Sequence, residues 1–487
     1  MYNRIRPITK YSSILLLASA IGLSGFTLSG CAGPRAHHSG NHGQPLVLVG
    51  GTIIDTSDFG RSEADIEDSV VIIRSNKIAA AGSRKSIEIP AGAKVLDISG
   101  KYVLPGFNDA FAAQNNQAHA NAYLYMGVTS IVGIDDPGGR RGPLYLKAKP
   151  GPHIYRLESV SGYDESRLSP TASSTADLRK RGRKLSAHEL RDQVDSLSRA
   201  GIRVLLLHYA LSPDQTEVIV QRARELGIST IGELGFTSYP EAIRAGVQAF
   251  VHVSRYSLEL APPEMRARLA GAPFGTPREE FYEYLTRVGS EDLRLKKYAP
   301  VLGSAFAGLI PTLSFEYLDL PDHDNPWKET VAAILDPKDI HLPANPATGK
   351  RDGAYAVPSY DFPATLSESL FRIEREYCRA GAKYLAGSGT TAFGTMPGIS
   401  LHTELKLLTV VGLTPRQALA AATANFETLF GWKGSGRIKA GYKADILVLD
   451  ANPVKDIGNA KKISRVILNG TVLDKENLLL VEPSAAR

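Results

Sequence analysis

The histidines best placed to do chemistry stand at the ends of two strand-like runs. His208 closes the run Arg203–His208, and His252 lies near the end of the run Ala249–Val253. Imidazole nitrogens and carboxylate oxygens are donors that bind zinc, so the two histidines could form a mononuclear site together with Asp135. The alternative is that His252 is a hydrogen-bonded histidine of the core.

Several other chemistries have no counterpart in the sequence. It contains no P-loop, no dinucleotide-binding glycine motif and no Gly-x-Ser-x-Gly nucleophile motif. The formal net charge of +6 falls to +3 when Arg4, Arg6 and Lys10 are removed with the first 30 residues. This bias is too weak to indicate nucleic acid as a partner. We expect Arg140-Arg141 and the run Arg179–Lys184 to be solvated loops, with a site for acidic partners as the alternative.

Residues 1–30 are typical of a lipoprotein signal peptide. A basic start is followed by the apolar run Ile14–Ile21 and then by Leu28-Ser-Gly-Cys31. The apolar run is shorter than the roughly 20 residues that a bilayer-spanning helix needs. We expect Cys31 to carry the lipid that anchors the protein in the cell envelope, at the outer membrane on its periplasmic side or surface. The alternative is a plain signal peptide with an incidental cysteine. Residues 31–44 predict a flexible tether.

The mature chain begins and ends with short strand-like runs. Residues 45–104 and 431–487 hold these runs, and examples are Leu46–Ile54 and Ala444–Asp450. Each set is too short to bury a core alone.

Between these ends, strands and helices alternate over residues 105–430. Capping boxes such as Ser186-x-x-Glu189 mark where helices begin. The eight strand-like runs predict an α/β fold of the (β/α)8, or TIM-barrel, type, with a doubly wound open sheet as the alternative. Two insertions, about 261–298 and 316–362, are long enough to be lids or partner surfaces.

The segment Lys101–Ala113 carries a family resemblance. Its Pro105, Gly106, Asp109 and Ala110 match the segment that opens the catalytic barrel of the amidohydrolase superfamily. The chain is most similar to the imidazolonepropionase-like and prolidase-like branch. The resemblance implies a TIM-type barrel with a small β-sandwich domain built from both chain ends. It also implies hydrolysis of carbon–nitrogen bonds at a metal centre.

Most positions that the resemblance assigns to metal ligands hold side chains that cannot coordinate. The family has two histidines, a carboxylated lysine, a third histidine and an aspartate where this chain reads Phe111, Ala113, Leu206, Gly232 and Gly389. Only the strand-six histidine is kept, as His252. An aromatic ring, a methyl group or a glycine offers no lone pair to zinc. We therefore expect no metal cofactor.

Polar residues near the predicted barrel mouth remain as candidates for a pocket. Asn115 follows the first strand, Asp135 follows the second, and His402 matches a Leu-His-x-Glu-Leu motif that the family has after strand eight. These residues could line a pocket, although ordinary loop or packing roles are the alternative.

Three functional hypotheses follow. The first is an envelope lipoprotein that has lost most metal ligands and binds a small molecule or peptide, or pairs with an active relative in an oligomer. The second is a hydrolase acting on non-peptide or dipeptide carbon–nitrogen bonds, with His208 and His252 as catalytic residues and zinc as its cofactor. The third is an envelope interaction protein that uses the two insertions.

Overall fold

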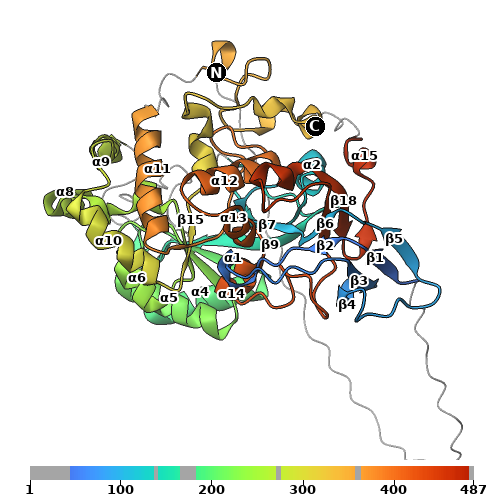
Figure 1. The fold of residues 1–487 in the computed structure, drawn as a ribbon. Helices are drawn as coiled ribbons and strands as arrows, with labels where there is room; N and C mark the ends of the chain where they lie inside the picture. The colour runs from blue at the N-terminus through green and yellow to red at the C-terminus, as the bar shows by residue number, and fades with distance from the viewer. Residues whose placement is uncertain (1–43, 137–140, 165–181, 270–275, 357–363, 482–487) are drawn as a thin grey trace, which may run out of the picture. The chain divides into compact units, whose positions relative to one another are not determined.

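The computed structural model describes residues 44–136, 141–164, 182–269, 276–356 and 364–481 (Figure 1). The predicted signal peptide, Cys31, nearly all of the tether, Arg140 and the start of the run Arg179–Lys184 lie outside them. Among the described residues, every helix is too short or too polar to cross a membrane.

Eight parallel strands form one sheet in chain order. They are β7 (Phe107–Ala112), β8 (Val128–Ile134), β9 (His153–Val160), β12 (Val204–Leu207), β13 (Ser229–Gly232), β14 (Ala249–Val251), β15 (Gly308–Ile310) and β16 (Lys383–Tyr384). The backbone of the first strand also bonds to the segment after the last one. The N–H of Ala110 donates to the carbonyl of Ala386 at 2.8 Å, and the N–H of Gly389 donates to that of Phe111 at 2.7 Å. These bonds link the two edges and confirm the predicted barrel.

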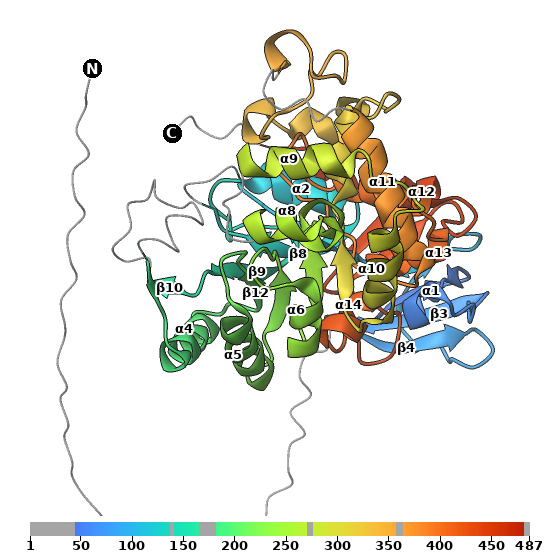
Figure 2. The ribbon, with the colours of Figure 1, turned by 90° about the vertical axis from the view of Figure 1, so that its left-hand side faces the viewer.

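Helices follow the strands and begin where the sequence signals a start. They are α2 (Gln117–Tyr125), α4 (Ala187–Arg199), α5 (Pro213–Glu225), α6 (Tyr239–Ala245), α10 (Leu293–Ser304), α11 (Ala364–Arg379), α12 (Ile399–Val410), α13 (Pro415–Ala421) and α14 (Ala424–Phe430). Ser186 and Glu189 form the predicted capping box at the start of α4. Figure 2 shows α4, α5 and α6 lying along the outside of the strands.

The two chain ends meet in a pair of small sheets. One has the order β4 (Lys77–Ser83), β3 (Ser69–Arg74), β1 (Leu46–Val49) and β5 (Lys94–Asp97). The other has the order β19 (Thr471–Val472), β18 (Ile463–Leu468), β17 (Ile446–Leu449), β6 (Tyr102–Pro105) and β2 (Thr52–Ile53). In Figure 1 these blue and red strands lie side by side. Leu48, Val103 and Ile446 belong to one buried cluster, so the β domain shares its core between both ends.

The described residues of the two insertions fold into short helical pieces. The first contains α8 (Pro263–Leu269) and α9 (Thr276–Leu285), and it is preceded by α7 (Val253–Tyr256) and η1 (Leu258–Leu260). The second contains η2 (Leu313–Asp319), η3 (Pro326–Lys328), η4 (Thr330–Ile334), η5 (Pro337–Asp339) and η6 (Gly353–Tyr355). Val331 and Ala332 of η4 pack in a buried cluster with Ala122 of α2 and Met396. This part of the second insertion is therefore anchored on the barrel.

The remaining elements are small: α1 (Ser57–Gly60), β10 (Tyr163–Asp164), β11 (Arg183–Lys184), η7 (Ile457–Lys461) and α15 (Lys475–Leu478).

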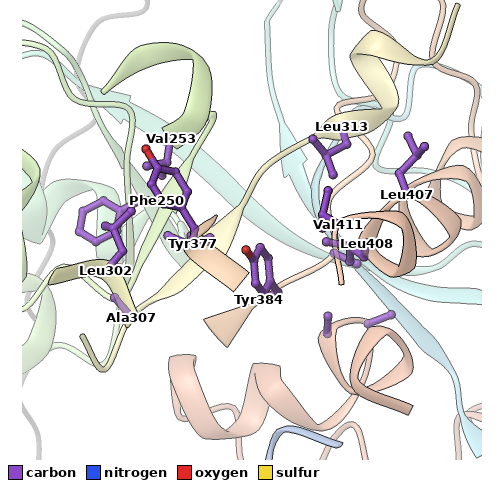
Figure 3. Close-up of a cluster of buried hydrophobic side chains, with 14 of the residues drawn as sticks. Phe250, Val253, Leu302, Ala307, Leu313, Tyr377, Tyr384, Leu407, Leu408 and Val411 are labelled. Atoms are coloured by element: carbon purple, nitrogen blue, oxygen red, sulfur yellow. The ribbon is translucent and has the colours of Figure 1, made fainter. Parts of the chain in front are cut away.

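Two apolar cores support the barrel. Outside it, Phe250 of β14, Leu302 of α10 and Tyr377 of α11 are buried between the strands and the covering helices (Figure 3). A second cluster includes Phe111 and Leu206, at two of the positions that the family resemblance assigns to metal ligands. Both side chains are apolar, so neither offers a metal-binding atom at its position.

Candidate functional site

A cavity of about 270 Å³ lies at the carboxyl ends of the barrel strands. Active sites of TIM-type barrels lie at this end. Its polar lining residues are Asp135, Asp136, Arg141, Glu158, Ser159, Glu233 and His252, and its apolar and aromatic ones are Phe111, Ile134, Leu157, Leu206, Tyr256, Phe315, Ala392 and Phe393. The cavity is therefore the candidate functional site.

His252 is held in one orientation by the end of the neighbouring strand. It directly follows β14 with φ of 58°, in the left-handed region. The Thr312 hydroxyl donates to the carbonyl of Pro311 at 2.6 Å, and it lies 2.5 Å from Nδ1 of His252. A hydroxyl has a single proton, and we assign that of Thr312 to the bond with Pro311, so that Nδ1–H of His252 donates to Thr312. The lone pair of the ring is therefore on Nε2, which lies 4.0 Å from Oε1 of Glu233.

The electrostatic surroundings keep this imidazole neutral. Burial lowers the pKa of His252 well below its ordinary value, and the positive charges of Arg255 and Arg141 lower it further. Nε2 of His252 and the Glu233 carboxylate are thus two hydrogen-bond acceptors separated by 4.0 Å. This arrangement is suited to holding a donor group of a ligand.

The structure places the five non-coordinating residues as follows. Phe111 and Leu206 line the cavity from β7 and β12, Gly232 is the last residue of β13, and Ala113 is buried just beyond β7. A Cβ atom at Gly389 would lie 2.1 Å from Cε1 of Phe315. The space for a side chain at position 389 is thus filled by an aromatic ring. Among the described residues, no group of three or more His, Cys, Asp or Glu side chains could hold a metal ion.

Of the other residues predicted from sequence, Asp135 lines the cavity, where its Oδ1 accepts from the N–H of Leu144 at 3.0 Å. Asn115 instead donates to the carbonyls of Arg141 and Pro143 at 2.5 and 2.9 Å. It does not line the cavity, but it positions the loop that brings Arg141 there.

The cavity lining includes neither of the other two candidate histidines. His208 Nδ1 accepts from the N–H of Ala210 at 3.2 Å, and its ring stacks on Tyr209 at 3.8 Å. Nε2 of His402 forms a hydrogen bond with the carbonyl of Met126 at 2.8 Å. Burial lowers the pKa of both histidines to about 4. Asp135 and His252 share the cavity, and His208 does not join them in a mononuclear site.

Arg141 lies in a loop, as predicted, but it is only partly exposed and lines the cavity. Its guanidinium carbon lies 5.1 Å from the ring centroid of Phe111, inside the cavity. A guanidinium is weakly hydrated and stacks well on an aromatic face, so the ring can replace water as its neighbour.

An aromatic wall, formed by Phe111, Phe315 and Phe393, surrounds the His252 side of the cavity. The ring of Phe111 packs edge to face against that of His252, with 5.4 Å between the ring centroids. The ring centroid of Phe315 lies 5.2 Å from that of His252. The ring centroids of Phe315 and Phe393 are 4.9 Å apart. The wall combines residues from β7, from η2 and from the loop after β16, so distant parts of the chain build it together.

Sequence reasoning missed Glu158 and Glu233, which supply two of the cavity's carboxylates. Glu233 directly follows β13, and Glu158 lies near the end of β9. A charged residue at the carboxyl end of a strand-like run was the available signal, since those ends meet at the barrel mouth. Phe315 and Phe393 had no comparable signal, because Phe315 belongs to the 3-10 helix η2 and Phe393 to a loop, and neither directly ends a strand-like run.

A buried carboxyl group lies close to the same end of the barrel. Oε2 of Glu404 accepts from the N–H of Ser314 at 2.8 Å, and burial raises the pKa of Glu404 from 4.5 to about 8. The nearby Asp109 raises the pKa of Glu404 further. Between about pH 4.5 and 8 the folded chain therefore keeps a proton that the unfolded chain has released. This difference destabilises the fold as pH rises through that window.

We expect Glu404→Gln to remove this pH dependence. The free energy of unfolding of the variant, relative to the unmodified protein, should increase from pH 5 to pH 8 and then level off. Urea unfolding at pH 5, 7 and 9 measures the difference. Glu283→Gln, whose side chain is 76% exposed in the unmodified protein, is the matched control. Parallel pH profiles for Glu404→Gln and the unmodified protein would contradict the prediction.

Comparison with known proteins agrees with this architecture. A model of the amidohydrolase family matches residues 366–473. The D-aminoacylase of Alcaligenes xylosoxydans xylosoxydans is 25% identical over 88% of this chain and 94% of its own length. An imidazolonepropionase of Deinococcus radiodurans is 23% identical over 84% of this chain and 92% of its own length.

Among solved structures, a putative prolidase from Bifidobacterium longum superposes with a TM-score of 0.54. It is 20% identical and covers 90% of this chain and 98% of its own. At that identity the likeness shows the fold alone.

Proposed function

The chain belongs to the amidohydrolase superfamily, and from this premise we propose that its barrel-mouth cavity binds a small molecule without the superfamily's metal centre. The observation that carries the proposal is the replacement of the strand-eight ligand position by Gly389, whose side-chain space Phe315 fills. A superfamily-type centre needs a defined set of nitrogen and oxygen donors. The residues present do not fit such a centre.

The cavity itself has the features of a binding site. It is concave, it is lined by aromatic rings and apolar side chains, and it holds a few polar groups in fixed positions. A volume of about 270 Å³ is at the small end for ligand pockets. It suits a molecule of about ten to fifteen non-hydrogen atoms.

The envelope location is part of the same proposal and comes from the sequence. The pattern that ends at Cys31 supports a lipid-anchored protein of the cell envelope. Mass spectrometry of the mature N-terminus would test it, with a diacylated or triacylated Cys31 as the expected result. A chain that begins at another residue, with Cys31 absent or unmodified, would overturn this part.

Filling the cavity tests the binding proposal. We expect the protein, purified without chelator, to hold well below one zinc per chain and to bind members of a fragment library. Leu206→Trp should remove that binding, because residue 206 lines the cavity. Val95→Trp, on the exposed surface of β5, is the control and should leave binding unchanged. If no fragment distinguishes Leu206→Trp from the control, the proposed function is wrong.

A second candidate is hydrolysis of carbon–nitrogen bonds, and the comparisons favour it. The curated relatives are named as enzymes, a D-aminoacylase and an imidazolonepropionase. In this chain the base for such a reaction would be Nε2 of His252, which faces the cavity. Its pKa is held well below the ordinary value, which makes it a weak proton acceptor, so the geometry supports binding better.

Two measurements made together separate the two candidates. Metal analysis is combined with an amide-hydrolysis assay on N-acyl amino acids and dipeptides. About one zinc per chain, together with activity that is lost in His252→Ala, would establish the enzyme. Absence of both, with fragment binding retained, would establish the binding protein.

A further inference from the structure

We propose that the ligand of this cavity is a small organic cation, a primary ammonium group on an apolar or aromatic body. The inference rests on the proposed function and adds the ligand's chemical class. Its basis is the combination of four carboxylates, one guanidinium and a fixed pair of acceptors in one small cavity.

The charges that line the cavity favour a cation. Asp135, Asp136, Glu158 and Glu233 supply the carboxylates, and Arg141 supplies the guanidinium. His252 adds no positive charge while it donates through Nδ1 and keeps its lone pair on Nε2. A partly enclosed site with this excess of negative groups attracts cations and repels anions.

The acceptor pair selects a group with several donors. An atom placed between Nε2 of His252 and Oε1 of Glu233 can approach both, because they are 4.0 Å apart. A primary ammonium carries three N–H donors and can bond to both acceptors at once. A hydroxyl has only one donor and a carboxylate has none. Hydrogen bonds between an ammonium and a carboxylate are also stronger than those between neutral groups.

The aromatic residues complete the recognition. Tyr256 and the aromatic wall line the same cavity as the acceptor pair. Their rings present apolar surface to the body of the ligand and negative π faces to its charge. A bare metal ion or a small inorganic cation would leave this surface unused.

A matched set of probes tests the ligand class: phenethylammonium, 2-phenylethanol and 3-phenylpropanoate. They share a phenyl ring on a short chain and differ in the charge of the end group. We expect isothermal titration calorimetry to give a Kd for phenethylammonium at least tenfold lower than for the other two. Glu233→Gln should raise that Kd at least tenfold, and Glu283→Gln, an exposed change of the same charge, should leave it unchanged.

Thermal unfolding of each variant verifies that it is folded. Glu158→Gln is the second cavity variant and should weaken phenethylammonium binding in the same direction. If the alcohol or the carboxylate binds as tightly as the cation, and Leu206→Trp removes that binding, the cavity function stands and the cation inference fails. If neither the three probes nor the fragment library binds, both proposals fail.

Discussion

Replacing Glu316 by alanine is expected to lower the free energy of unfolding by about 3–5 kcal/mol, which is the usual effect of leaving a buried charge without its partner. Glu316 and Arg255 form an ion pair whose side chains are only 3% and 6% exposed. Ser367 donates to Oε2 of Glu316 at 3.2 Å, so the carboxylate is held from a second side.

Urea unfolding measures the loss, with Glu283→Ala as the control. Glu283 also has an arginine neighbour, Arg287, but both side chains are well exposed, so the change there should be below about 1 kcal/mol. The double variant Arg255→Met/Glu316→Leu removes both charges and should recover most of the stability. A loss below about 1 kcal/mol for Glu316→Ala would show that the pair is not buried as described.

The same ion pair supports the cavity. The guanidinium carbon of Arg255 lies 5.7 Å from the ring centroid of Phe315 and 5.8 Å from that of Phe393. Both rings belong to the aromatic wall. Glu316 is adjacent to Phe315, so an ion pair between α7 and η2 fixes the residue whose ring fills the space beside Gly389. Stability and site geometry thus depend on the same contacts.

The barrel was predictable because its signals are local. Each strand-like run is followed by a helix with its own start, as at Ser186-x-x-Glu189, and these patterns need no knowledge of distant contacts. The β domain needed one further step, since β6 and β17 pair across more than 300 residues. That step came from the family resemblance, because strand patterns alone do not specify their partners.

The site was only partly predictable. The loss of donors at Phe111, Leu206 and Gly389 could be recognised, because a residue type that cannot coordinate is visible in the sequence. The hydrogen-bond partner of His252 could not be predicted, since Thr312 is 60 residues away in the sequence. Its role also depends on which acceptor its hydroxyl proton points to. Phe315 fills the space at Gly389 only because the chain after β15 turns back over the barrel mouth.

Gly389→Ala provides the second test with a large expected effect. The residue has φ of +67°, and a Cβ there would lie within 2.1–2.3 Å of two ring atoms of Phe315. We expect a loss of about 3 kcal/mol or more in the free energy of unfolding, from backbone strain and overpacking together. Gly389→Asp should lose at least as much and gain no zinc, because one carboxylate does not make a set of ligands.

A substitution at Gly431 separates the effect of backbone strain from that of overpacking. Its φ is +71°, and nothing lies within 4 Å of a Cβ built on it, so Gly431→Ala reports the strain alone. We expect the loss for Gly389→Ala to exceed that for Gly431→Ala by about 1–3 kcal/mol. In a double-mutant cycle, Phe315→Ala should cancel most of this excess, since the two residues compete for one volume. Equal losses for the two glycines would mean that Phe315 moves aside easily, and position 389 would then be open to a metal ligand.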